Sequence, residues 1–170
     1  MATIDATLGG ATSNSYVTLL EAEDYFGARL FSDNWNNASE TNKIAALIQA
    51  TKRIDREKFY GDRVSSTQKL AFPRLGISYI DNVLYDGIIP EQIKDATCEV
   101  AIYMLSNDIS QKDTNIGDKK SVAVGSIKVE YAQQDRVVVQ STNTLSDYVL
   151  TLLEDFSYTA SSAGVGFISR

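Results

Sequence analysis

The 170-residue chain contains no histidine and only one cysteine, Cys98. The lack of histidine excludes Ser-His-Asp and Cys-His nucleophile systems, histidine general bases and histidine metal sites. A single cysteine cannot form an internal disulfide, which suits a reducing compartment. No stretch approaches the roughly 18 apolar residues of a membrane span, and the N-terminal residues lack the pattern of a signal peptide. These absences favour a soluble protein that is not an enzyme.

Other chemical motifs are also missing. There is no CxxC pair and no metal-ligand cluster, and Gly9-Gly10 lacks the lysine of a phosphate-binding loop. The acidic pairs, such as Glu21 with Glu23 and Glu154 with Asp155, fit solvated surface charge better than catalytic carboxylates. Cys98 lies in an apolar pattern and fits a small core residue better than a nucleophile. The sequence therefore predicts no catalytic residue, no cofactor and no metal.

The composition is that of a globular protein, with 44% hydrophobic and 22% charged residues, and its net charge is −6. An acidic protein is repelled on average by nucleic acid, so DNA binding would require a local basic patch. Most Lys and Arg residues are scattered along the chain, but two clusters stand out. One is the pair Lys119-Lys120, and the other comprises Lys52, Arg53, Arg56 and Lys58. Asp55 and Glu57 lie among them, which favours a solvated helix face over a binding patch.

Aromatic side chains offer a second possible DNA contact. Tyr16, Tyr25 and Phe26 could stack on the bases of a single strand. Because no coherent basic groove accompanies them, packing in the core or an interface is the favoured interpretation. Trp35, the only tryptophan, lies in a polar turn and is predicted to anchor that loop on the core rather than to stack on a ligand.

The chain is organised around the stretch from Asn42 to Gly76. Apolar residues recur there at helical spacing and predict a helix from about Thr41 to Lys58; they are Ile44, Leu47, Ile48, Thr51 and Ile54. Phe72-Pro73 stops any helix, because proline lacks a backbone donor and restricts the residue before it. A buried helix tied to this aromatic-proline corner is a scaffold feature.

Three further helices are predicted. Thr18 and Glu21 have the spacing of a capping box that starts a helix from Leu19 to about Leu30. Pro90 fits the first position of another helix, whose apolar positions continue to Leu105 in the strongest helical pattern of the chain. Either Thr144 or Ser146 caps a last helix, whose apolar face comprises Leu145, Val149, Leu152, Leu153 and Phe156.

Between the last two helices the hydrophobic period changes. Val122 and Val124 alternate, and Ile127 and Val129 then alternate on the other parity, so Gly125 marks a bulge or a tight bend. A second β-type run covers 136–140. The two runs are predicted to form a hairpin, or to be strands that pair elsewhere.

The predicted fold is mainly α: a small helical bundle with an inserted β-hairpin and flexible N- and C-terminal arms. Residues 1–14 form the N-terminal arm, residues 15–156 a single domain with a β ribbon at about 121–140, and residues 157–170 a C-terminal tail. The tail is rich in Ser, Ala and Gly, and it ends in an apolar pair, Phe167-Ile168, followed by Ser169 and Arg170. Such a tail fits either a segment that docks on a partner or a frayed chain end.

An ordered set of short motifs adds a family resemblance over roughly Ser15 to Leu105. The set comprises Ser15-Tyr16-Val17-Thr18-Leu19, Glu21-Ala22, Tyr25-Phe26, Trp35, Lys43, Ala45-Ala46-Leu47-Ile48, Ala50-Thr51, Arg53-Ile54-Asp55, Phe59, Gly61, Arg63, Gln68, Leu70, Phe72-Pro73-Arg74, Gly76, Ile89-Pro90, Ile93, Ala96, Glu99 and Ala101. It resembles a family of tailed-phage proteins labelled DnaT-like single-stranded-DNA-binding proteins, which look like head–tail connector (adaptor) proteins. Phe72 stands where a tryptophan is more usual.

The resemblance implies a structural virion protein at the neck of a bacteriophage, made in the host cytoplasm. Such an adaptor forms a homo-oligomeric ring, expected to be a dodecamer, that docks on the portal and joins the capsid to the tail after genome packaging. Expected partners are the portal protein, a tail-side neck or tail terminator protein, and double-stranded DNA that passes through the channel without specific binding. No membrane is involved. Phe167, Ile168 and Arg170 are the predicted portal contacts.

The family label keeps a second function open, namely single-stranded DNA binding in phage replication. The two functions differ in salt dependence, because DNA affinity falls steeply with salt as counterions are released. An enzyme is a distant third possibility.

Overall fold

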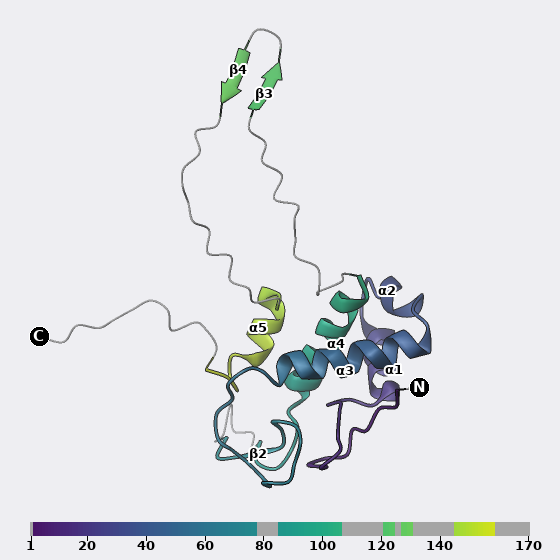
Figure 1. Ribbon diagram of the computed structural model, residues 1–170, viewed down its shortest axis with the longest axis vertical. Helices are drawn as coiled ribbons and strands as arrows, with labels where there is room; N and C mark the ends of the chain where they lie inside the picture. Colours follow the sequence, from purple (N-terminus) through teal and green to yellow (C-terminus); the bar gives the residue numbers. More distant parts are fainter. Residues whose placement is uncertain (1, 78–84, 107–120, 125–126, 131–144, 159–170) are drawn as a thin grey trace, which may run out of the picture. The chain divides into compact units, whose positions relative to one another are not determined.

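The structure is a computed structural model that describes residues 2–77, 85–106, 121–124, 127–130 and 145–158 (Figure 1). The chain divides into two compact units. One comprises residues 1–107 with 145–170, and the other comprises residues 108–144. The first unit contains helices α1 to α5 and the short strands β1 and β2, and the second contains strands β3 and β4. The prediction of a mainly helical fold with a small hairpin is confirmed.

Helix α1, Leu19–Ala28, begins at the predicted capping box. Thr18 accepts a hydrogen bond from the Glu21 amide, and the Glu21 carboxylate accepts one from the Thr18 amide at 2.7 Å. The helix ends two residues before the predicted Leu30, because Arg29 is extended and its guanidinium donates to the carbonyls of Leu30 and Phe31. Leu30, the predicted last residue of this helix, is exposed.

The single turn of α2, Asp33–Asn36, carries Trp35 into the core. The Trp35 ring stacks on Phe26 with 4.3 Å between centroids, and its indole nitrogen donates to Glu23 at 3.1 Å. Lys43 donates to the same carboxylate, and its Nζ lies 5.2 Å from the centroid of the indole ring. The prediction that Trp35 anchors its loop is confirmed, because none of its surface is left for a ligand.

Helix α3, Glu40–Ile54, is shorter than predicted. Its N-cap is Ser39, and its apolar face buries Leu47 and Ile54 as the sequence indicates. It ends at Ile54 because Asp55 turns its carboxylate back to accept from the Tyr16 hydroxyl and the Ala71 amide. The predicted continuation to Lys58 is therefore wrong, and residues 55–58 form the start of a loop.

That loop is closed by a two-residue ladder. Strand β1, Asp62–Arg63, pairs antiparallel with β2, Arg74–Leu75. The buried side chain of Gln68 holds the intervening turn, accepting from the Ser65 amide and donating to the carbonyls of Leu70 and Pro73. Gly61 lies in this loop and is left-handed, with φ +69°.

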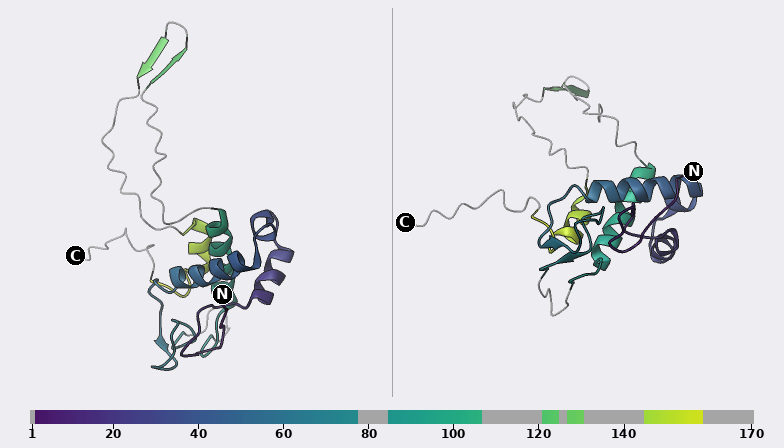
Figure 2. Two further views of the ribbon diagram at one scale, coloured as in Figure 1. Left: turned by 45° about the vertical axis from the view of Figure 1, so that its right-hand side comes forward. Right: turned by 60° about the horizontal axis from the view of Figure 1, so that its bottom comes forward.

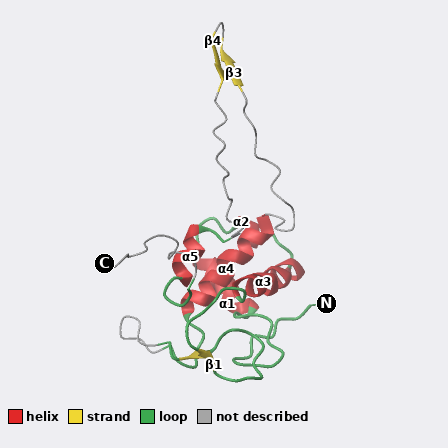
Figure 3. Cartoon of the chain, turned by 60° about the vertical axis from the view of Figure 1, so that its left-hand side comes forward, coloured by secondary structure: helices red, strands yellow, loops and turns green. Residues whose placement is uncertain are grey.

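Helix α4, Glu91–Ser106, is the centre of the helical unit. It packs most extensively on α3 and also contacts α1, α2 and α5, Asp147–Leu153 (Figure 2). Cys98 is buried in it as predicted, and Ser146 rather than Thr144 caps α5. Figure 3 shows the helices gathered together, with the loop that carries β1 beside them. In the described residues no helix is both long and apolar enough to cross a membrane.

Residues 2–14, predicted as an N-terminal arm, make contacts that the sequence did not indicate. The Asp5 amide donates to the Asn14 side chain at 2.9 Å, and the Asn14 amide donates back to the Asp5 carbonyl at 2.8 Å. The Lys69 amide donates to the Gly10 carbonyl at 3.1 Å, which joins this segment to the β1–β2 loop. The C-terminal tail beyond Tyr158 lies outside the described residues.

In the second unit, β3, Ser121–Val124, pairs antiparallel with β4, Ile127–Glu130, so that Val124 faces Ile127. The predicted hairpin partner, residues 136–140, lies outside the described residues. Both paired strands therefore come from the first predicted β-type run, so the prediction that this run pairs as one strand with 136–140 is not what the described residues show. Gly125, predicted as a bulge or a tight bend, lies outside the described residues, and the pairing of Val124 with Ile127 fits the bend.

Two glycines give a matched test of this fold. A Cβ on Gly61 would lie 2.1 Å from the Leu75 carbonyl oxygen, and the backbone there is left-handed. We expect Gly61→Ala to destabilise the chain by at least about 1–2 kcal/mol. Gly27 lies in α1 with open space around it, so Gly27→Ala should stabilise by about 0.5–1 kcal/mol. Urea unfolding of both variants checks the prediction, and equal effects would contradict it.

Candidate nucleic-acid interface

Two exposed tyrosines lie side by side on the helical unit. The ring centroids of Tyr60 and Tyr158 are 4.0 Å apart with an angle of 53° between the planes. Tyr60 is 39% exposed and Tyr158 is 56% exposed, so part of each ring faces solvent. Exposed aromatic rings close to positive charge are the usual contacts for the bases of a single strand.

Backbone pairing positions these two side chains. The segment from Lys58 to Tyr60 runs antiparallel to the segment from Phe156 to Tyr158. The Tyr60 amide donates to the Phe156 carbonyl at 2.9 Å, and the Tyr158 amide donates to the Lys58 carbonyl at 2.8 Å. Side chains alternate along such segments, so Phe59 is buried while its neighbours Lys58 and Tyr60 are exposed.

Arg74 fixes the loop beneath the tyrosines. Its guanidinium donates to the carbonyl oxygens of Tyr60 at 2.5 Å and Ala71 at 3.2 Å, and also to that of Gly61. Burial, with Arg63 nearby, lowers the pKa of Arg74. Because its donors serve the backbone, Arg74 is a structural cation that holds Tyr60 in place.

Positive charge is concentrated in the stretch that carries this surface. Residues 52–74 contain seven Lys or Arg and three Asp or Glu, a net charge of +4 in a chain of −6. Two of the three carboxylates are engaged: Asp55 accepts from Tyr16 and Ala71, and Glu57 pairs with Arg53 at 2.6 Å. Lys58 and Arg63 are exposed and flank Tyr60 in the chain. We call Lys58, Tyr60, Arg63 and Tyr158 the basic tyrosine surface.

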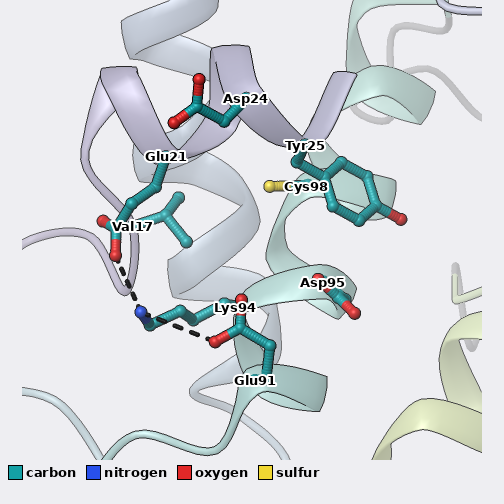
Figure 4. Close-up of a pocket in the computed structure, with 8 residues that line it drawn as sticks. All are labelled: Val17, Glu21, Asp24, Tyr25, Glu91, Lys94, Asp95 and Cys98. Atoms are coloured by element: carbon teal, nitrogen blue, oxygen red, sulfur yellow. Dashed lines mark hydrogen bonds and ion pairs between the residues drawn. The ribbon is translucent and has the colours of Figure 1, made fainter. Parts of the chain in front are cut away.

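A cleft between α1 and α4 has the opposite charge (Figure 4). It has a volume of about 240 Å³ and is lined by Val17, Glu21, Asp24, Tyr25, Glu91, Lys94, Asp95 and Cys98. Lys94 donates to Glu21 at 2.7 Å and lies 3.7 Å from Glu91, which leaves a surplus of carboxylates that disfavours a phosphate.

The chemistry of this acidic cleft is also limited. Burial raises the pKa of the Cys98 thiol to about 12, so the thiol stays protonated and is a poor nucleophile. Burial, with Glu91 and Glu99 nearby, raises the pKa of Asp95. Within the described part of the chain, no group of three His, Cys, Asp or Glu side chains is arranged to hold a metal ion.

The structure places the sequence-predicted residues in different settings. Tyr16 and Phe26 are buried, and the half-buried Tyr25 donates its hydroxyl to Glu99 at 2.7 Å, so packing rather than base stacking is their role. Burial and the nearby Asp55 carboxylate raise the pKa of Tyr16. The predicted portal contacts Phe167, Ile168 and Arg170 lie outside the described residues.

The basic tyrosine surface is not evident from the sequence. The charges from Lys52 to Lys58 were expected to form a solvated helix face. Lys58 lies beyond the helix end, and Tyr158, a hundred residues later, pairs beside it. One sequence feature that could have indicated this surface is the excess of Lys and Arg, which continues through Arg63, Lys69 and Arg74.

The profile of one protein family, described as "Putative DnaT-like ssDNA binding protein", matches residues 2–170. The chain belongs to this family. The match extends the resemblance seen from Ser15 to Leu105 over nearly the whole chain. Neither the curated proteins nor the solved structures contain a significant match.

The ion pair in the acidic cleft makes stability depend on pH. Burial opposes the charged form of Glu21, but Lys94 and the Thr18 amide and hydroxyl outweigh it and lower the pKa of Glu21 to about 2. A depressed folded-state pKa contributes stability that is present above the unfolded value of about 4.3 and is lost as pH falls towards 2. We expect Glu21→Gln to lower the unfolding free energy at pH 7 by about 0.5 kcal/mol, since the carboxylate is partly exposed.

Thermal unfolding at pH 7 and pH 2 measures this effect. The difference between Glu21→Gln and the native chain should nearly disappear at pH 2. Glu154→Gln, at an exposed position beyond α5, is the control and should match the native chain at both pH values. A difference for Glu21→Gln that is the same at both pH values would rule out the ion pair as its cause.

Proposed function

We propose that this chain binds single-stranded DNA at the basic tyrosine surface. The observation that carries the proposal is the exposed Tyr60–Tyr158 pair within the most basic stretch of an acidic protein. An acidic protein needs such a local patch to bind nucleic acid. Family membership supports the same function, because the family is described by single-stranded DNA binding.

Binding would divide between the two kinds of side chain. The tyrosine rings stack on bases, which tolerates any sequence because every base has a flat face. Lys58 and Arg63 contact phosphates and supply the salt-dependent part of the affinity. The acidic cleft repels phosphate, so the strand is not expected to bind there. Binding of this kind should therefore show little preference for base sequence and a strong dependence on salt concentration.

Fluorescence anisotropy with labelled oligo-dT tests this proposal. Tyr60→Ala and Tyr158→Ala should each weaken binding by roughly 5- to 150-fold, because a stacked base contributes about 1–3 kcal/mol. Tyr148→Ala, at an exposed tyrosine on α5, is the matched control and should leave the affinity unchanged. Arg63→Gln should reduce the slope of log K against log salt by about 0.7. No binding in 50 mM salt would refute the proposal.

A second candidate function is the head–tail connector (adaptor) of a phage neck. The net charge of −6 favours it, because a channel that DNA must traverse should not hold the DNA. Exposed apolar side chains such as Leu30 and Phe31 also favour a chain whose surface meets other proteins. In this function the chain forms a ring, expected to be a dodecamer, between the portal and a tail-side neck or tail terminator protein.

The connector function predicts a portal contact at Phe167, Ile168 and Arg170. Phe167→Ser with Ile168→Ser should abolish co-purification with the portal protein, because the apolar pair is the anchor. Tyr158 stays intact in this variant, so DNA binding by the basic tyrosine surface is unaffected. Electron microscopy of the purified virion neck is the direct measurement. If the doubly substituted chain still binds the portal, Phe167 and Ile168 are not the portal contact. If the chain is absent from the virion neck, it is not a connector.

A further inference from the structure

The turn after α1 presents two large apolar side chains to solvent. Leu30 is 78% exposed and Phe31 is 89% exposed, more than any other large hydrophobic residue in the described part of the chain. Two adjacent apolar side chains in water are unfavourable unless something covers them.

A partly buried ion pair holds this turn in place. The Arg29 guanidinium donates to the carbonyl oxygens of Leu30 at 2.8 Å and Phe31 at 2.9 Å. The same guanidinium makes a two-pronged contact with Glu99 of α4, at 2.6 and 2.9 Å. The hydrogen bond to Glu99 raises the pKa of Arg29, as expected for a guanidinium paired with a carboxylate. The exposed side chains are therefore carried on a fixed turn.

The backbone of Phe31 is strained as well. Its φ of 58° makes it the one non-glycine residue with a positive φ among the described residues. Asn or Gly is favoured in this left-handed conformation, and a bulky side chain is an outlier there. The exposure of the Phe31 ring and the strain of its backbone both raise the free energy of the isolated molecule. A contact with another molecule would explain why a phenylalanine occupies this position.

A cleft lies directly beside the turn. Its volume is about 250 Å³, and it is lined by Arg29, Phe31, Asn34, Glu99, Ile102, Tyr103, Ser106 and Ser146. An apolar cavity of about 150 Å³ is enough to hold benzene. Ile102 and Tyr103 of α4 supply an apolar wall, so the cleft can receive one phenyl ring. The protruding ring and a cleft of suitable size thus lie at the same edge of one chain.

We propose that two copies of this chain associate through these features, with Phe31 of each copy seated in the cleft of the other. Because the ring and the cleft are adjacent, a two-fold axis lets both copies exchange their rings at once, which is the self-complementary contact of a symmetric dimer. The composition also fits the centre of an interface, where Phe, Tyr and Arg are enriched and unpaired charge is depleted.

Charge favours a second copy meeting at this edge. Each copy carries −6, so two copies repel one another over most of their surfaces. Among the described residues that line the cleft, only Arg29 and Glu99 are charged, and they neutralise each other. The cleft therefore presents no unpaired carboxylate to a second acidic copy. The proposal does not depend on DNA binding, since the basic tyrosine surface comprises other residues.

Sedimentation velocity of the full chain over a range of concentrations tests the proposal. We expect a monomer–dimer equilibrium whose dissociation constant rises by about tenfold or more in Phe31→Asn. Asn suits the left-handed backbone, so this variant should fold as well as the native chain or better. Leu20→Gln removes another exposed apolar side chain, on α1, and should leave the equilibrium unchanged.

Cross-linking tests the geometry. In a mixture of Phe31→Cys and Tyr103→Cys chains, a disulfide should join the two variants under mild oxidation. The Phe31→Cys chain mixed with Leu20→Cys should give no such product. A native chain that stays monomeric at all concentrations would overturn the proposal, as would association that Phe31→Asn leaves intact. An assembly larger than a dimer that needs Phe31 would overturn the two-fold arrangement, and a need for Phe31 in DNA binding by a monomer would assign the ring to DNA.

Discussion

The helical unit depends on the contacts of one buried ring, Phe72. It meets Tyr16, Phe59 and Phe156 edge-on, with centroids 6.1, 4.9 and 6.4 Å away. These partners come from the N-terminal segment, the loop after α3 and the turn after α5. Burying such rings contributes roughly 1.5–3 kcal/mol each, and edge-on pairs add about 0.5–1.5 kcal/mol. One side chain thus joins three segments that are distant in sequence.

The basic tyrosine surface is a consequence of this packing. Because Phe59 and Phe156 both turn inward to Phe72, the residues beside them are brought into register. Tyr60 and Tyr158 then emerge together on the outer face, with the backbone hydrogen bonds of Lys58 and Phe156 between them. Arg74, two residues after Phe72, caps the same loop. The core therefore sets the spacing of the residues proposed to contact DNA.

Acidic, basic and apolar surfaces of the helical unit are formed by different segments. The cleft between α1 and α4 is acidic, the loop after α3 is basic, and the turn after α1 carries exposed Leu30 and Phe31. Ion pairs such as Arg29 with Glu99 and Lys94 with Glu21 fasten α1 to α4 and also place the turn and the acidic cleft. Scaffold contacts and candidate functional surfaces are thus built from the same residues.

Local signals in the sequence determined much of this fold. The capping box at Thr18, the apolar periodicity of α3 and α4 and the aromatic-proline corner at Phe72 act within a few residues, so the sequence alone predicts them. The sequence narrowed the cap of α5 to Thr144 or Ser146, and the structure shows Ser146. The parity change at Gly125 left a bulge and a tight bend open, because the alternation of side chains shifts in both cases; the pairing of Val124 with Ile127 fits the bend. The predicted end of α3 was too late because the Asp55 carboxylate accepts hydrogen bonds from Tyr16 and Ala71. No local sequence pattern reveals these distant contacts.

What only the tertiary structure decided is which distant residues share a surface. The pairing of Tyr60 with Tyr158 joins positions almost a hundred residues apart, and the exposure of Leu30 and Phe31 follows from Arg29 reaching across to Glu99. Composition and periodicity report the preferences of short segments, whereas these surfaces arise from contacts between segments. The sequence therefore determined the elements and the family, and the packing of those elements decided where a partner could bind.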